Sequence, residues 1–145
     1  MTIDDNKLVY AGVSVIIQND RNEFLLGKRI HSTGNGLYSL PGGKIDKGET
    51  AKEAAVRELY EEANVVIDKN DLVYSGYSDD IFESEDVQYI TLYFYVRDNA
   101  EGFKNLEPDK CEGWEFLSLE SLKELGEDDF FCDTYQVLKD CEIDF

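Results

Sequence analysis

Three glutamates and one arginine crowd into residues 57–62, which read RELYEE. Glu58 and Glu62 are four positions apart, so on a helix they are neighbouring like charges, an arrangement that destabilises an isolated helix by roughly 0.2–0.5 kcal/mol. Hard cations such as Mg²⁺ prefer oxygen ligands, and carboxylates spaced in this way converge on one or two ions. We therefore interpret Glu58, Glu61 and Glu62 as a divalent metal site that attracts a phosphorylated substrate.

A solvated acidic helix face is the alternative, because charge runs usually lie on solvated faces. Such a face favours interleaved lysines that relieve the repulsion, yet only Arg57 stands within this cluster. A solvated face also leaves the glycine-containing loop before the helix unexplained. These two observations favour the metal site.

The helix that carries the acids is predicted from its cap. Thr50 and Glu53 form a T-x-x-E capping box, which predicts a helix that begins at Thr50 and runs to Ala63. On a helical wheel, the three glutamates share one arc with the small residues Ala51 and Ala54. The residues on the opposite arc, which we expect to face the core, are Val56, Leu59, Tyr60 and Ala63.

Strand-forming segments surround this helix. The expected strands are residues 9–17, 24–29, 71–80, 87–96 and 114–118, with one further short strand in LYSLPGG. The segments LESLKEL and DTYQVLKDC predict one or two helices near the C-terminus. This order predicts an α+β fold, a mixed β-sheet sandwiched between helices, in a single domain over residues 1–145.

Composition narrows the range of partners. The formal net charge of −18 repels a nucleic-acid polymer, whereas a small anionic ligand remains compatible if metal ions supply positive charge. The three cysteines lack CxxC spacing, which argues against a zinc ribbon or a disulfide framework. No apolar run is long enough to span a membrane. We expect a cytoplasmic protein with no membrane partner.

From Gly43 onward the chain resembles the Nudix box, G-x5-E-x7-R-E-U-x-E-E-x-G-U, where U is aliphatic. The positions that match in register are Gly43, Glu49, Arg57, Glu58, Leu59, Glu61, Glu62 and Val65. Asn64 departs from the box, because the family has glycine there. We expect position 64 to take the left-handed conformation, which asparagine tolerates better than other residues with a side chain.

The resemblance implies a Nudix-type fold and hydrolysis of a nucleoside diphosphate linked to another group, with Mg²⁺ or Mn²⁺ as cofactor. It implies Glu58 and Glu62 as the main metal ligands and Glu61 as a ligand or the base that activates water. The Gly43 carbonyl is implied as a further ligand. Arg57, counted with the catalytic set, and Glu49 are implied to hold the loop and helix in place.

Residues outside the box complete the predicted site. Glu112 is an extra metal ligand or base in our prediction, weighed equally against a surface glutamate, and Glu107 and the acidic segment of residues 79–86 are weaker candidates. Arg29 is expected to contact phosphates, and His31 is expected to be a surface loop residue. The predicted substrate-binding residues are Arg29, Leu40, Gly42 and Phe131, with Tyr38 and Phe130 as further aromatics near a base.

The segments LPGGKID and EPDKCEGWEFL resemble the MutT-like group of Nudix enzymes. This resemblance implies that a nucleoside or deoxynucleoside triphosphate is cleaved to the monophosphate and pyrophosphate. A nucleotide-sugar hydrolase of the GDP-mannose type, an ADP-ribose hydrolase and a non-catalytic nucleotide sensor are the alternatives. Members of the group are often homodimers, so a homodimer is one assembly that the resemblance allows.

Overall fold

The structure is a computed structural model that describes residues 8–30 and 33–141. Within these residues one sheet contains β1 (Tyr10–Gln18), β2 (Phe24–Arg29), β3 (Tyr38–Ser39), β4 (Gly42–Lys44), β5 (Val73–Phe82), β6 (Val87–Arg97) and β7 (Cys111–Leu117). The α-helices are α1 (Ala51–Ala63), α2 (Leu119–Lys123) and α3 (Thr134–Asp140). Short 3-10 turns are η2 (Lys69–Asp71), η3 (Glu83–Glu85) and η4 (Glu127–Asp129). This is the predicted α+β fold.

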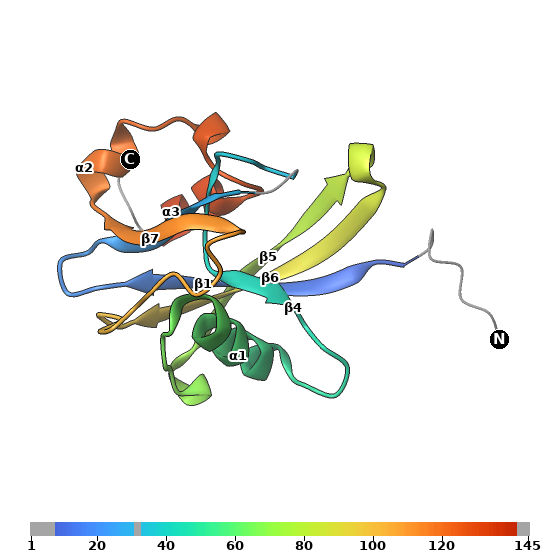
Figure 1. Ribbon diagram of the computed structural model, residues 1–145, viewed down its shortest axis with the longest axis horizontal. Helices are drawn as coiled ribbons and strands as arrows, with labels where there is room; N and C mark the ends of the chain where they lie inside the picture. The colour runs from blue at the N-terminus through green and yellow to red at the C-terminus, as the bar shows by residue number, and fades with distance from the viewer. Residues whose placement is uncertain (1–7, 31–32, 142–145) are drawn as a thin grey trace.

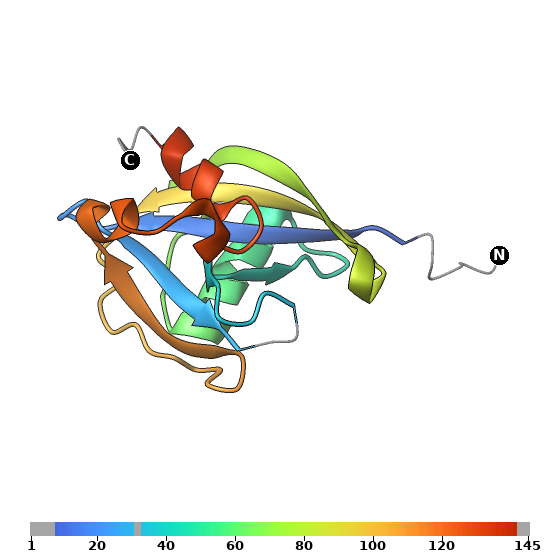
Figure 2. The same ribbon diagram turned by 90° about the horizontal axis from the view of Figure 1, so that it is seen from above.

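The sheet is mixed because β1 and β6 run parallel, from Tyr10 opposite Tyr89 to Gln18 opposite Arg97. The main strand order is β3-β2-β1-β6-β5; β4 also pairs with β1, and β7 with β2, both antiparallel. Figure 2 shows β1 beside β6 and β2 beside β7. The pairing of β4 with β1 fixes the glycine strand immediately before the loop that leads into α1.

Helices cover both faces of this sheet, with α1 on one face and α2 and α3 on the other (Figure 1). The alternation of β1 side chains explains the two layers, since successive residues of a strand point to opposite faces. Val13, Val15 and Ile17 pack in the core beneath α1, whereas Ile16 belongs to the core beneath α2 and α3.

The cap prediction for α1 is confirmed at both ends. Glu53 N donates to Thr50 Oγ1 at 3.2 Å, and Thr50 N donates to Glu53 Oε1 at 2.8 Å, which completes the capping box. At the other end Asn64 has φ 57° and ψ 33°, the expected left-handed conformation. Its side-chain amide also donates to the Gly102 carbonyl at 3.1 Å, so asparagine adds a contact that glycine lacks.

The predicted buried arc of α1 is wrong at Tyr60, whose exposed fraction is 57%. The fully buried residues of the helix are Ala54, Ala55, Leu59 and Ala63. The small side chains of Ala54 and Ala55 let α1 approach the sheet closely, so the buried arc includes them. As a result Glu58 and Glu62 turn toward β4 rather than into solvent.

Two smaller outcomes complete the fold. The strand near Trp114 begins earlier than predicted, at Cys111, because it pairs with β2 over a longer stretch. The cysteines Cys111, Cys132 and Cys141 are all unpaired, as expected. In the described part of the chain, no helix has both the length and the apolar character needed to cross a membrane.

Candidate active site

The acids of α1 open onto a cavity of about 590 Å³, which we call the acidic cleft. Its lining includes the glycines Gly42 and Gly43 and the acids Glu58, Glu61, Glu62 and Glu107. Four glutamates around one opening form a strongly anionic site. A negatively charged substrate enters such a site only if cations reduce the charge.

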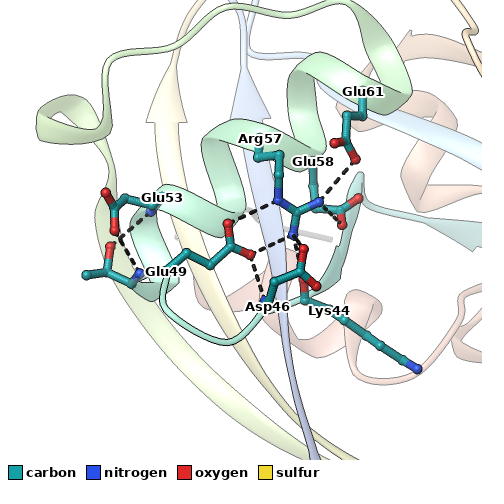
Figure 3. A network of polar contacts seen from close by, with 8 residues as sticks. Lys44, Asp46, Glu49, Glu53, Arg57, Glu58 and Glu61 are labelled. Carbon is teal, nitrogen blue, oxygen red and sulfur yellow. Dashed lines mark hydrogen bonds and ion pairs between the residues drawn. The ribbon is translucent and has the colours of Figure 1, made fainter.

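Arg57 supplies part of the positive charge around this cleft (Figure 3). Its Nε and Nη2 donate to Glu49 at 3.1 and 2.7 Å, and Nη2 also donates to the Lys44 carbonyl at 2.9 Å. Its Nη1 donates to Glu58 at 2.9 Å and to Glu61 at 3.1 Å. The bonds to Glu49 raise the pKa of Arg57 and lower the pKa of Glu49 below its ordinary value. Arg57 thus ties the loop before α1 to the helix and steadies two of the acids.

Glycine is required where β4 meets these acids. The Glu58 carboxyl lies so close to Gly43 that a Cβ there would overlap it, and a Cβ at Gly42 would overlap the Val13 carbonyl. The Gly42 amide donates to Glu62 Oε2 at 3.2 Å. The two glycines therefore let a strand backbone contact two acidic side chains directly.

Burial changes the ionisation of the acids. It raises the pKa of Glu62 to about 9, assisted by the charge of Glu58 and opposed by the Gly42 amide. Burial also raises the pKa of Glu58, against the hydrogen bond from Arg57. Because the pKa of both side chains is raised, this carboxyl pair favours retention of a proton when no cation is bound.

The donor set fits a hard divalent cation, because carboxylates that share a proton can exchange it for a metal ion. Among residues 8–30 and 33–141, no three acidic, histidine or cysteine side chains already converge on one point. Arg57 accounts for this arrangement, since it draws the carboxylates of Glu58 and Glu61 toward its guanidinium (Figure 3). Glu58 and Glu62 both contact the backbone of the glycine strand, Glu58 at Gly43 and Glu62 at Gly42.

The structure brings Glu107, rather than Glu112, to the acidic cleft. Glu112 is exposed on β7 and does not line the cleft, whereas its neighbour Cys111 is buried and does. Successive strand residues point to opposite sides, which explains this difference. The charge of Glu107 also contributes to the raised pKa of Glu62, although Glu107 forms an ion pair with Lys110 at 3.5 Å.

A second cavity, of about 410 Å³, adjoins the acidic cleft. We call it the strand cavity, and its lining includes Ser14, Asp80, Phe82, Thr91, Tyr93 and Phe131. The predicted substrate-binding residues Arg29, Leu40 and Gly42 line both cavities, and Phe131 lines the strand cavity alone. The structure therefore gathers this predicted set around two adjoining compartments.

Arg29 and Phe131 form part of the wall of the strand cavity. The Arg29 guanidinium lies 3.8 Å from the centre of the Phe131 ring, and Arg29 Nε donates to the Thr33 carbonyl at 3.0 Å. The rings of Phe131 and Phe82 are stacked, with centroids 5.6 Å apart. Burial lowers the pKa of Arg29, an effect opposed by neighbouring groups including Cys132. A positive charge is thus fixed where the two cavities meet.

Lys44 lines both cavities and was not among the predicted site residues, whereas Asp80 lines the strand cavity and lies in the acidic segment 79–86, a weaker candidate in the sequence. Lys44 Nζ lies 4.4 Å from the Tyr10 ring centre and 5.9 Å from that of Tyr89. These partners lie on strands distant in sequence, so only the position of Lys44 directly after the glycine pair could have indicated a role. His31 lies outside the described residues.

The class of protein follows from three features: a mixed sheet between helices, acidic side chains set against a glycine strand, and a cavity beside them. Residues 10–134 match the NUDIX domain family, and the chain belongs to that family. It is therefore a Nudix hydrolase, an enzyme that acts on phosphoric anhydride bonds. The resemblance noted in the sequence is confirmed.

Relatives of known name support this assignment. The chain is 36% identical over 119 residues to an Escherichia coli 8-oxo-dGTP diphosphatase, covering 79% of this chain and 82% of that protein. It is 26% identical over 143 residues to an RNA pyrophosphohydrolase of Pelagibacter ubique, covering 85% and 87%. A MutT Nudix hydrolase from Burkholderia pseudomallei has the same fold, with a TM-score of 0.81 at 22% identity over 92% of this chain and 98% of that one.

Proposed function

We propose that this enzyme cleaves a nucleoside triphosphate, or its deoxy form, to the monophosphate and pyrophosphate. The observation that carries the proposal is the shared wall of the two cavities, which includes Arg29, Gly43 and Lys44. A nucleoside triphosphate can therefore extend through both cavities, with its polyphosphate in the acidic cleft and its base in the strand cavity. The named activity of the E. coli relative supports the same class of substrate.

Nudix hydrolases use divalent metal ions, and we propose Mg²⁺ or Mn²⁺ here. Glu58 and Glu62 would hold the ion, with the Gly43 carbonyl and Glu61 as further oxygen donors. Glu107 takes the place we predicted for Glu112 because of its position in the cleft. When bound, a divalent ion supplies charge neutralisation and polarises the phosphate oxygens.

The protein groups have separate parts in the proposed reaction. Arg29 and Lys44 bind the phosphates and orient the anhydride bond. Glu61 accepts a proton from the attacking water in this proposal, and its side chain, 52% exposed, is accessible to water. Arg57 holds Glu58 and Glu61 in position and touches no substrate. Leu40 and Phe131 enclose the base and exclude water from it.

A substrate panel with product identification tests this proposal. Ribo- and deoxyribonucleoside triphosphates, an oxidised guanine nucleotide, ADP-ribose, GDP-mannose and 5′-triphosphate RNA are incubated with Mg²⁺ and separated by ion-exchange chromatography. We expect a nucleoside monophosphate and pyrophosphate from the triphosphates and no product when EDTA replaces Mg²⁺. Water labelled with ¹⁸O then identifies the phosphorus that is attacked.

Other outcomes of the panel would replace the proposal. Free mannose, or ribose phosphate from ADP-ribose, without turnover of triphosphates would assign one of the alternative hydrolase activities. Binding of nucleotides without any product would indicate a sensor. The net charge of −18 disfavours the RNA substrate, so faster cleavage of RNA ends than of free triphosphates would also contradict the proposal.

We also propose that the enzyme is cytoplasmic, that residues 1–145 form one domain, and that the protein assembles as a homodimer. Light scattering of the purified protein across a concentration series tests the assembly. A mass of about 33 kDa, twice the 16.6 kDa of the chain, is expected for the dimer.

A further inference from the structure

Asp80 carries a carboxylate in the strand cavity that the proposed chemistry leaves unused. Its exposed fraction is only 8%. Asp80 lies opposite Tyr89 in the β5–β6 pair, and Ser78 lies opposite Thr91, so these side chains share one face of the sheet. Asp79, between them on β5, is exposed and points to the opposite face. Strand alternation therefore aims one acid of this pair into the cavity.

The hydroxyl groups around Asp80 are arranged as donors to its carboxylate. Thr91 Oγ1 donates at 2.6 Å, and Ser78 Oγ donates to the two carboxylate oxygens at 3.1 and 3.2 Å. Because the proton of Ser78 is used in this way, the Tyr93 hydroxyl, 2.9 Å from Ser78 Oγ, must donate to it. The chain of hydroxyls fixes Asp80 as an acceptor.

Arg29 and Lys44 line the same cavity as Asp80, but neither is paired with its carboxylate. In residues 8–30 and 33–141, no lysine or arginine forms an ion pair with it. An ionised carboxylate has about four lone-pair sites, and the strong donors Ser78 and Thr91 each have one proton to fill them. The thiol of Cys132 also contacts Asp80, but a thiol is a weak donor. Acceptor capacity is left for a ligand with N–H groups.

We propose that Asp80 selects the nucleobase by accepting two adjacent N–H donors, the pattern that the Watson–Crick edge of guanine presents. Guanine places N1–H beside its 2-amino group, so one carboxylate can accept both bonds. Adenine and cytosine place an amino donor beside a ring acceptor, and uracil places one N–H between two carbonyls. Each of these edges sets an acceptor against the carboxylate. The inference rests on the proposed function, since it needs a nucleotide in this cavity.

A purely structural role is the competing explanation, because the bond from Thr91 also ties β6 to Asp80 on β5. The two roles differ in what they do to specificity. Loss of a structural contact lowers activity on all bases by one common factor. Loss of a base-reading group changes the ratio between bases, and a good bidentate contact is worth roughly 10- to 100-fold in such a ratio.

The test measures kcat/KM with Mg²⁺ for GTP, ITP and ATP on the wild type, Asp80→Asn and Asp79→Asn. ITP lacks the 2-amino group of GTP and keeps N1–H, so the wild type should prefer GTP over ITP by about 10-fold. Asp80→Asn should abolish that preference and shift the ATP-to-GTP ratio toward ATP by about 10-fold or more, because an amide offers a donor beside an acceptor. Asp79→Asn makes the same charge change outside the cavity and should leave both ratios unchanged.

Equal use of GTP and ITP by the wild type would overturn the inference, and so would an equal loss on all three bases in Asp80→Asn. If Asp80→Asn does not fold, the wild-type ratios decide alone. If the wild type cleaves no nucleotide, the proposed function is ruled out instead. Calorimetric binding of guanosine against inosine then tests Asp80 separately, and equal or absent binding of the two nucleosides overturns its role.

Discussion

In the acidic cleft the guanidinium of Arg57 compensates crowded glutamates, whereas in the strand cavity neutral hydroxyls surround the carboxylate of Asp80. A cluster of acids that still holds a proton has high affinity for a cation, because metal binding relieves the repulsion. A carboxylate fixed by neutral donors offers a directional acceptor instead. We therefore expect carboxylates to bind a cation in the acidic cleft and to accept directional hydrogen bonds from the base in the strand cavity.

We expect the acidic cleft to determine the rate of cleavage and the strand cavity to determine the selectivity between bases. Changes in the acidic cleft should alter kcat for every substrate and leave the ratio between bases intact. Changes at Asp80 should alter the ratio. Residues in the shared wall, such as Gly43, should affect catalysis through the geometry of the acids that they contact.

The largest effect is expected for Glu58→Gln. Loss of this carboxylate removes a proposed metal ligand, and we expect kcat to fall by about 10³-fold on every triphosphate, within the range seen when a catalytic group is removed. The ratio of GTP to ATP turnover should stay at its wild-type value. Glu101→Gln, an exposed loop residue, is the control and should keep full activity. Undiminished turnover by Glu58→Gln would break the assignment of the cleft to catalysis.

Gly43→Ala should have the next largest effect. The added methyl group overlaps the Glu58 carboxyl and must displace it, and a displacement of about 1 Å in a catalytic group lowers kcat by roughly 10²-fold. Gly126→Ala is the matched control, because its Cβ would meet nothing closer than Asp129 at 3.9 Å. Steady-state kinetics and circular dichroism of both variants distinguish a displaced acid from a general loss of fold.

The stability of the metal-free enzyme should depend on pH through Glu62. Its pKa is about 9 in the folded protein against 4.5 for the free side chain, so the folded state holds a proton that the unfolded state releases. Stability should therefore fall as pH rises between those two values, by up to about 1.4 kcal/mol per pH unit, and level off above them.

Urea unfolding in EDTA at several pH values measures this slope. Glu62→Gln should flatten it, because glutamine does not titrate. Saturating Mg²⁺ should also remove the slope, because the ion replaces the proton. Stability that rises over the same pH range would show that the acidic cleft does not hold the proton.

The smallest effect is expected at Asn64. Asn64→Gly should change the free energy of unfolding by no more than about 0.5 kcal/mol, because glycine suits the left-handed conformation but loses the bond to Gly102. Asn64→Ala should lower stability by about 1 kcal/mol. Thermal unfolding measures both variants, and each should keep wild-type kcat because position 64 touches none of the glutamates of the cleft.

Local signals in the sequence were sufficient for the ends of α1. The cap at Thr50 and the left-handed residue at Asn64 depend on backbone geometry and on side chains a few positions away. The buried arc was less predictable, as Tyr60 shows. A helical wheel divides residues into arcs, but the position of the neighbouring sheet decides which arc is covered, and β4 covers the arc of Glu58 and Glu62.

The residues of the candidate site were likewise only partly predictable from the sequence. The sequence favoured Glu112 over Glu107, but the pleat of β7 turns Glu112 away from the cleft, and Glu107, in the loop before that strand, lines it instead. Lys44 was not among the predicted site residues. Its contact with Tyr10 and Tyr89 requires β1 and β6 to lie side by side.

By itself the sequence determined the family, the capped helix and the spacing of the acids on it, because a helix fixes the relation between residues three and four positions apart. Tertiary structure decided the strand cavity, where Asp80, Thr91 and Phe131 meet from separate segments. Their meeting depends on the register of β5 on β6 and on the path of the chain before α3. A shift of one residue in that register would point Asp79 into the cavity in place of Asp80.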